Sequence, residues 1–176
     1  MVSPWHRELP GVRLIPRLAA YCWGMTSPRL EKVTRANVLD ACRLRIKPEQ
    51  KGFVAPVSWS LAQAYVLPPE KVWPRLVYDG DQVVGFVMAA FDPDNERDLW
   101  HSFLWRLSVS ADHQGHGCGR FALEELYAEA LRRGHQRLMT SWDQGEHGPE
   151  NFYLRLGFQL TGEKLDNEVG GVRQLT

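Results

Sequence analysis

The sequence predicts a single α+β domain, and three observations carry this prediction. The chain has 176 residues, of which 44% are hydrophobic and 24% charged, as in one ordinary globular domain. Helical periodicity and β-rich runs follow one another in the order β-α-α-β-β-β-α-β-α-β-β. A glycine-rich loop separates the longest expected strand from the longest expected helix, so we expect the central strand to lead directly into that loop.

Two short helices are expected before the main strands. Asn37 and Asp40 mark the start of the first helix, which Pro48 ends. Ser58 is expected to cap the second helix, which Pro68 ends.

Three antiparallel strands are expected next. The β-rich runs Arg75–Tyr78 and Gln82–Phe91 are joined by Asp79-Gly80, a dipeptide that tolerates the positive φ values of a tight hairpin turn. The aromatic-rich run Leu99–Val109 predicts a central strand, which would carry His101.

The C-terminal half completes the order with two helices and three strands. Arg120–Arg133 has its apolar residues on one helical face. Arg137–Trp142 reads as a strand, Pro149–Leu156 as a short helix that begins with proline, and Phe158–Leu175 as two strands.

Charge and composition exclude several classes of protein. The 21 Lys and Arg residues balance the 21 Asp and Glu residues, so no global field draws the chain to nucleic acid or to anionic lipid. The longest apolar stretch, Val83–Phe91, is far shorter than the roughly 20 residues of a membrane helix. The three cysteines form no CxxC pair, and no His or Asp cluster lies beside them at ligand spacing. We therefore expect no nucleic-acid partner, no membrane, no metal and a cytoplasmic location.

Residues 1–24 contain no apolar run of signal-peptide length, so they read as an N-terminal extension. Met25 opens the segment before the first regular pattern. We expect one domain over residues 25–176.

The loop between the longest strand and the longest helix carries the chemistry. It reads Gln114-Gly-His-Gly-Cys-Gly-Arg120, with glycine at every second position. Such a loop can turn successive N–H groups toward one point, and the helix that follows adds positive charge, so it can bind a phosphate without lysine. The spacing fits neither the Walker loop nor the dinucleotide fingerprint. A glycine-rich turn without a ligand is the alternative.

Two blocks resemble the GNAT superfamily of N-acetyltransferases. Gln114, Gly117 and Gly119, which follow Leu107-Ser-Val109, match the signature that binds the pyrophosphate of acetyl-CoA, and Tyr153 precedes Gly157-Phe158 at the spacing of a second block. Further stretches resemble the bacterial diamine and polyamine acetyltransferase subgroup: Glu49–Ala55, Ser60–Tyr65, Val84–Phe86 and Leu104–Leu107.

The resemblance implies a GNAT-like mixed, mostly antiparallel sheet with flanking helices, in which the strands that end at Val109 and Trp142 splay apart. The pantetheine arm of the co-substrate acetyl-CoA would lie in the gap. The implied CoA-binding residues are Leu107, Ser108, Val109, Gln114, Gly115, His116, Gly117, Cys118, Gly119 and Arg120.

The resemblance also implies direct transfer to an amine. A backbone N–H near Val109 would stabilise the oxyanion, and Tyr153 would protonate the departing thiolate. An aromatic residue packed in the core is the alternative for Tyr153. Glu146 stands where relatives usually have the asparagine that holds pantetheine, so the resemblance does not assign that contact to this chain. Cys118 as an acyl-accepting nucleophile and His101 as a general base are weaker candidates.

The implied function is transfer of an acetyl group from acetyl-CoA to a primary amine of a small molecule, with a diamine or polyamine as the subgroup's acceptor. A non-catalytic acyl-CoA-binding or sensor module and a protein N-terminal or lysine acetyltransferase are the alternatives, and a homodimer stays open. Acidic runs over Asp92–Asp98 and around Glu163, Asp166 and Glu168 are candidates to hold an ammonium, with solvated loops as the alternative. Four tryptophans are candidates to line the acceptor pocket, with core packing as the alternative: Trp59, Trp100, Trp105 and Trp142.

A chain that begins at Met25 tests the expected domain boundary. We expect it to fold cooperatively, with a thermal transition by circular dichroism within a few degrees of that of the full chain, because residues 1–24 would add no core. A truncated chain that stays unfolded would contradict the boundary.

Overall fold

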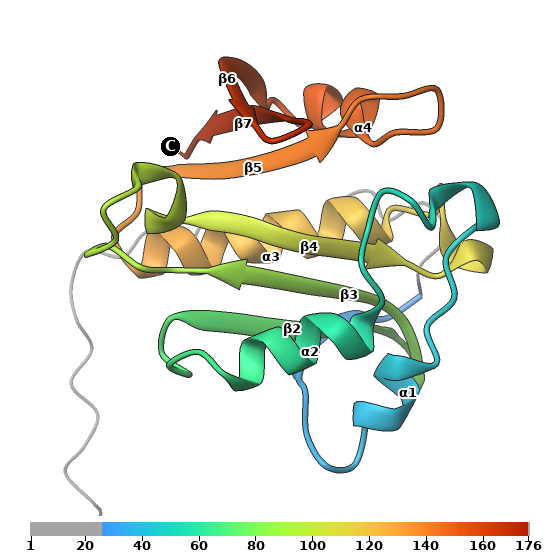
Figure 1. Ribbon diagram of the computed structural model, residues 1–176. Helices are drawn as coiled ribbons and strands as arrows, with labels where there is room; N and C mark the ends of the chain where they lie inside the picture. The colour runs from blue at the N-terminus through green and yellow to red at the C-terminus, as the bar shows by residue number, and fades with distance from the viewer. Residues whose placement is uncertain (1–25, 176) are drawn as a thin grey trace, which may run out of the picture.

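The computed structural model describes residues 26–175, so the expected extension over residues 1–24 lies outside the described part of the chain. One seven-stranded sheet with the order β1-β2-β3-β4-β5-β7-β6 organises these residues (Figure 1). Every neighbouring pair is antiparallel except β4 and β5, which are parallel. The predicted mixed, mostly antiparallel sheet with flanking helices is confirmed.

The elements follow the predicted order. The strands are β1 (Pro28–Lys32), β2 (Val72–Asp79), β3 (Gln82–Ala90), β4 (Phe103–Val109), β5 (Arg137–Asp143), β6 (Gln159–Leu165) and β7 (Glu168–Gln174). The helices are α1 (Val38–Cys42), α2 (Val57–Tyr65), α3 (Cys118–Arg132) and α4 (Glu150–Arg155), with 3-10 turns η1 (Pro48–Gln50), η2 (Asp98–His101) and η3 (Ala111–His113).

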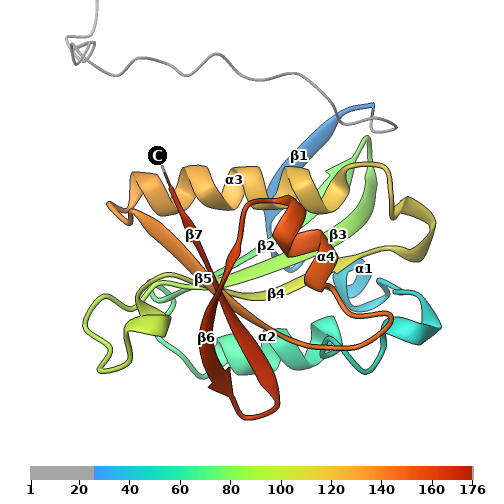
Figure 2. The ribbon, with the colours of Figure 1, turned by 90° about the horizontal axis from the view of Figure 1, so that it is seen from above.

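The helices cover both faces of the sheet. Figure 2 shows α3 above the sheet and α2 below it. Apolar residues of α3, among them Leu123 and Leu126, pack in one cluster with Leu104, Leu138 and Trp142. A second cluster joins residues of α1 and α2 to the opposite face of β2 and β3: Ala41, Val57, Val72, Leu76, Tyr78, Phe86 and Met88.

The first two helices differ from their predicted bounds. α1 has five residues and ends at Cys42, well before Pro48. α2 begins at Val57, after Pro56 at the N-cap, and no side chain caps it. Ser58 therefore lies inside the helix, and the prediction that it caps α2 is wrong: the preceding proline already fixes the extended backbone that the N-cap position requires.

The central strand begins later than predicted. Residues 98–101 form the turn η2, and β4 starts only at Phe103. The His101 ring contacts Asn95 O at 2.8 Å through Nε2 and Asp98 Oδ1 at 3.1 Å through Nδ1. These polar contacts and the burial of Leu99 hold the turn, so the placement of His101 on the central strand is wrong.

β4 and β5 separate soon after they pair. Their register contains only Phe103 with Met139 and Leu104 with Thr140. The β3–β4 register shifts between Met88 and Ala89, which marks a bulge in β4 at this point. β4 stays paired with β3 and β5 stays paired with β7. The predicted gap therefore lies between β4 and β5, beyond their two paired residues.

Residues 26–175 contain neither a membrane-spanning helix nor a metal-binding cluster. No helix there combines the length and the apolarity that crossing a bilayer requires. Within the same residues, no three His, Cys, Asp or Glu side chains gather where they could hold a metal ion.

Gly171 of β7 gives room to a core tryptophan, and a methyl group there tests that packing. A Cβ at Gly171 would lie 2.6 Å from Cη2 of Trp142, which is 2% exposed. We expect Gly171→Ala to lower the free energy of unfolding by about 1–3 kcal/mol, as overpacked cores do. Gly52→Ala is the matched control because its Cβ would meet no atom within 4 Å. Equal denaturation midpoints for the two variants would contradict this account.

Candidate active site

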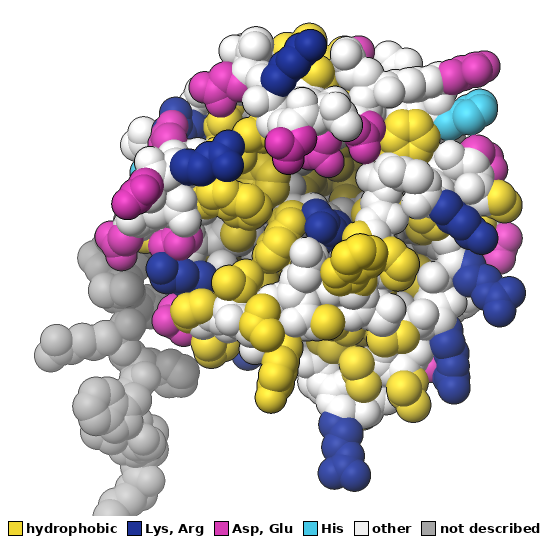
Figure 3. Space-filling model, viewed as in Figure 1, with side chains coloured by type: hydrophobic (Ala, Val, Ile, Leu, Met, Phe, Trp, Pro, Cys, Tyr) yellow, Lys and Arg dark blue, Asp and Glu magenta, His cyan; other side chains and the backbone are white. Residues whose placement is uncertain are grey.

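A cavity of about 1130 Å³ occupies the gap between the diverging strands. Its walls come from β4, β5, α4, the start of α3, the segment between α1 and α2, and the turn between β6 and β7. The space-filling view shows a hollow on this face, with acidic side chains along one rim and hydrophobic side chains along the other (Figure 3). Side chains of both strands therefore share one solvent-accessible site.

The glycine-rich loop presents backbone N–H groups to one end of this cavity. Gly115 and Gly117 have φ values of 82° and 90°, which are left-handed conformations that favour glycine. Gly117 is the N-cap of α3 and no side chain caps the helix, so the first-turn amides lack acceptors from the helix itself. These amides and the positive end of the helix dipole are the groups that would hold an anion here.

Gly119 has a packing role that the sequence did not reveal. A Cβ there would lie 2.9 Å from Cζ of Phe152 and 3.7 Å from Cγ2 of Val109. The missing side chain thus lets α4 approach the start of α3. A substitution at Gly119 would disturb Phe152 before it met a ligand.

Gln114 ties the loop to the end of β4. Its Nε2 donates to Val109 O at 3.2 Å and to Gln50 Oε1 at 2.6 Å. Gln114 therefore holds the loop and the strand end at a fixed distance. Arg120 lines the cavity at an exposed position, whereas His116 is exposed and does not line it.

Cys118 belongs to the core. The residue is 1% exposed, and its Sγ–H donates to His113 O at 3.4 Å. It packs in the same cluster as Leu123 and Leu126. The residue lines the inner wall of the cavity, but this burial removes the support for Cys118 as a nucleophile.

The end of β4 turns backbone groups toward the gap. Ser110 N, just after β4, donates to Val84 O of the neighbouring strand β3 at 2.8 Å. Backbone groups alternate between the two edges of a strand, so the N–H of Val109 faces the opposite edge, where β5 has already diverged. Leu107 and Ser108 line the same cavity.

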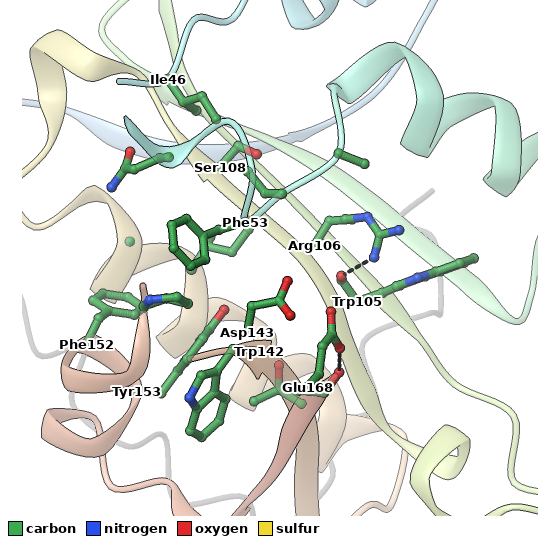
Figure 4. A pocket seen from close by; sticks show the side chains of 18 of the residues that line it. Ile46, Phe53, Trp105, Arg106, Ser108, Trp142, Asp143, Phe152, Tyr153 and Glu168 are labelled. Atoms are coloured by element: carbon green, nitrogen blue, oxygen red, sulfur yellow. Dashed lines mark hydrogen bonds between the residues drawn. The ribbon is translucent and has the colours of Figure 1, made fainter. Parts of the chain in front are cut away.

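Tyr153 reaches the cavity from α4. Its ring is 7% exposed and stacks on Trp142 with centroids 5.0 Å apart. In Figure 4 the hydroxyl points into the cavity. Burial raises the pKa of Tyr153 well above its ordinary value, and a hydrogen bond with the Thr140 side chain offsets part of the rise. The phenol therefore stays protonated and available as an acid across the ordinary pH range.

The opposite part of the cavity carries polar and charged groups, of which the sequence analysis indicated only Glu168 as a candidate. Arg106 comes from β4, Ser141 and Asp143 from β5, and Glu168 from β7 (Figure 4). The Ser141 hydroxyl donates to Glu168. Asp143 was missed, although alternation along the strand puts it on the same face as Ser141.

Other expected contacts lie elsewhere. No carboxylate of the run Asp92–Asp98 lines the cavity, whereas Asp166 and Glu168 of the second acidic group do. Glu146 is exposed and does not line it either. It therefore does not replace the asparagine that the resemblance implied. The expected base candidate His101 faces a separate, smaller cavity beside Arg137 and Met139.

Comparison with known protein families decides the class of this site. A model described as the acetyltransferase (GNAT) family matches residues 38–158, well over half of the chain. The chain belongs to the GNAT family. This membership agrees with the predicted enzyme class, because the family is one of acetyltransferases. It does not confirm the diamine and polyamine subgroup.

Relatives and solved structures agree with this assignment. The chain is 33% identical to rat (Rattus norvegicus) N-acetyltransferase 8F1 over 88 residues, which are 49% of this chain and 39% of the rat protein, so it spans about two fifths of that relative. An acetyltransferase from Thermus thermophilus has a TM-score of 0.68 and 24% identity, covering 86% of this chain and 99% of the other. The PaiA N-acetyltransferase from Thermoplasma acidophilum, in complex with coenzyme A, has a TM-score of 0.65 and 13% identity, covering 85% and 99%. Both structures share the fold.

The cavity fits the co-substrate of the family. No side chain caps the start of α3, and its N-cap residue Gly117 has a left-handed backbone conformation. The first amides of the helix are therefore free to bind a diphosphate. The unpaired edge of β4 beyond Leu104 offers backbone partners to an extended, amide-containing chain such as pantetheine.

Glycine substitutions in the loop test this anion site. We expect Gly117→Ala to weaken CoA binding measured by calorimetry about tenfold or more, because Ala disfavours the φ of 90° that aims the first amides. Gly119→Ala should weaken it as well, through the displacement of Phe152. Gly134→Ala is the matched control, because Gly134 has a φ of 87° and does not line the cavity. Unchanged CoA affinity in both loop variants, with unchanged melting temperatures, would remove the assignment.

Proposed function

We propose that the protein transfers the acetyl group of acetyl-CoA to the primary amine of a small molecule by direct transfer. The observation that carries this proposal is the position of Tyr153, whose buried hydroxyl faces the same cavity as the glycine-rich loop and the carboxylates of β5 and β7. A CoA-binding module without catalysis would not need a protonated phenol between these two parts.

The residues of the chain divide into those that hold the donor and those that act on it. The amides of Gly117–Arg120 would hold the pyrophosphate, with the Arg120 side chain at the mouth of the cavity. The β4 edge from Leu107 to Val109 would bind the pantetheine arm. Acetyl-CoA supplies a thioester, whose carbonyl carbon accepts the amine and whose sulfur leaves as a thiolate.

Three groups of the chain would move protons and charge. Asp143 and Glu168 are placed to take the proton that an ammonium must lose before it can attack. The N–H of Val109 faces the gap, where it would stabilise the charge on the carbonyl oxygen. Tyr153 would give its proton to the leaving sulfur, and its raised pKa keeps that proton in place until the thiolate forms.

A diamine or polyamine is the second acceptor candidate. It rests on the resemblance of the sequence to that subgroup, and Asp143, Asp166 and Glu168 on the acceptor side of the cavity would hold a second ammonium. Mass spectrometry of the products from an amine panel and from peptide substrates separates small-molecule transfer from acetylation of a protein N-terminus or lysine.

Tyr153→Phe tests the catalytic assignment. The change keeps the stacking on Trp142 and removes only the acid, so kcat should fall about 10²-fold or more with little change in CoA affinity. Tyr127→Phe is the matched control. Its hydroxyl is also buried, has no hydrogen-bond partner among the described residues and does not line the cavity, so kcat should stay within about twofold.

The same experiment separates the alternatives. A Tyr153→Phe variant with wild-type kcat would leave Tyr153 as a packing aromatic and would contradict the proposed acid. A wild-type protein that binds CoA but acetylates no amine would support the sensor module instead. Because the pKa of Tyr153 is raised, kcat of the wild type should show no loss of the acid up to about pH 10, the ordinary tyrosine pKa.

A further inference from the structure

Arg106 is a half-buried cation in the acceptor part of the cavity. Its Nη1 donates to Trp105 O at 2.8 Å and its Nη2 to Gln63 Oε1 at 3.3 Å. Its Nε is buried and has no partner among the described residues. No carboxylate within residues 26–175 forms an ion pair with Arg106. The guanidinium thus keeps donor capacity that the protein itself does not use.

This position differs from that of the other basic residues around the cavity. Those are all exposed, so water solvates their charges: Lys51, Arg97, Arg120, Arg155 and Lys164. Burial lowers the pKa of Arg106, and the charge of Glu168 opposes that effect. A partly buried cation with no counter-ion and an unpartnered, buried Nε has lost part of its hydration, which points to a ligand anion as its partner.

Arg75 on β2 is a comparable arginine outside the site. Its guanidinium lies 4.5 Å from the ring of Trp73, two residues earlier in the chain, and its Nη1 donates to Pro74 O at 2.8 Å. The Arg106 guanidinium lies 5.3 Å from the ring of Trp105, the residue before it. Arg75 lies near Glu129 and does not line the cavity, so only Arg106 of the two is offered to a ligand.

Carboxylates face Arg106 across the gap. Glu168 on β7 accepts a hydrogen bond from Ser141, and Asp143 lies beside it on β5 (Figure 4). Glu168 is near enough to influence the charge of Arg106, yet the two form no ion pair. The acceptor part of the cavity therefore has carboxylates on one side, from Glu168 and Asp143, and the Arg106 guanidinium on the other.

Aromatic rings complete this part of the cavity. Trp100 packs edge-on against Trp105 with centroids 5.5 Å apart, and against Phe103 at 4.7 Å. All three residues line the cavity. An apolar group of the acceptor would bury its surface against them.

We propose that the acceptor is a free α-amino acid with an apolar side chain, whose carboxylate binds Arg106. Its ammonium group faces Glu168 and Asp143, and its side chain packs on Trp100 and Trp105. This inference rests on the proposed acetyltransferase function. A polyamine carries no anion for Arg106 and would bring further positive charge to that side of the cavity, so Arg106 selects against it.

Matched acceptor pairs test the inference in the full chain. We would measure kcat/KM for L-phenylalanine and L-leucine, for their decarboxylated amines phenethylamine and 3-methylbutylamine, and for spermidine. Loss of a charge-assisted hydrogen bond should make each plain amine about 10- to 100-fold poorer than its amino acid, with spermidine poorer still.

Arg106→Gln should cut kcat/KM for the amino acids by about 10- to 100-fold and change that for the plain amines by less than about threefold. For each pair we would divide kcat/KM of the amino acid by kcat/KM of the plain amine. Comparing this ratio between wild type and variant cancels the different basicity of the two amines. Arg75→Gln is the matched control and should leave the ratio unchanged. The wild-type comparison stands even if a variant fails to fold.

The outcomes distinguish a failure of the proposed acceptor from a failure of the proposed acetyltransferase function. Turnover of plain amines or spermidine equal to or above that of the amino acids, with a ratio that Arg106→Gln does not change, would overturn the amino-acid acceptor and leave the acetyltransferase intact. Absence of turnover with every amine, in a protein that binds CoA, would overturn the proposed function and the acceptor with it.

Discussion

The site depends on one constraint of the sheet, which is that β4 and β5 pair over only two residues each. β5 stays bound to β7 along its whole length, and β4 stays bound to β3, so both strands keep regular structure on their outer edges. Their facing edges lose pairing beyond Leu104 and Thr140. Backbone groups that are removed from water without a partner cost about 1–3 kcal/mol each, so this gap is stable only where water or a ligand reaches it. The fold thus contains an unpaired strand edge inside a continuous sheet, and a substrate with amide groups can take the place of the missing neighbour.

The two halves of the sheet hold together through the core beneath α3. Leu104 of β4, Leu138 and Trp142 of β5 and Tyr153 of α4 belong to one buried cluster with the apolar face of α3. Thr140 adds a polar tie, because its hydroxyl donates to Leu104 O at 3.1 Å near the point where the strands part. Gly171 of β7 leaves room for the ring of Trp142, and Trp142 in turn stacks on the ring of Tyr153. The orientation of the proposed acid is therefore a consequence of core packing, and the site and the stability of the domain rest on the same residues.

Local signals in the sequence predicted most of the fold. The hairpin between β2 and β3, the glycine-rich loop and α3 were predicted correctly, since turn glycines and helical periodicity act over short distances. The start of β4 was not, because η2 is held by contacts of His101 with Asn95 and Asp98 that strand propensity cannot anticipate. Arg106 and Asp143 of the candidate site were also missed. They lie on strands that become neighbours only through a parallel pairing, and no short motif records which side chains a bulge turns inward.

The positions of charge explain how a chain with no net charge would bind two charged substrates. The proposed donor side offers a helix N-terminus and backbone amides, which would attract a diphosphate without any buried basic side chain. The proposed acceptor side instead holds one half-buried arginine and faces it with carboxylates, so that side would distinguish molecules by the arrangement of their charges rather than by their sum. Tyr153 lines the same cavity and its raised pKa keeps it neutral, so the proposed acid would meet the thiolate without repelling either substrate. A partly buried guanidinium without an ion pair among the described residues is the physical reason to look for its partner in the acceptor.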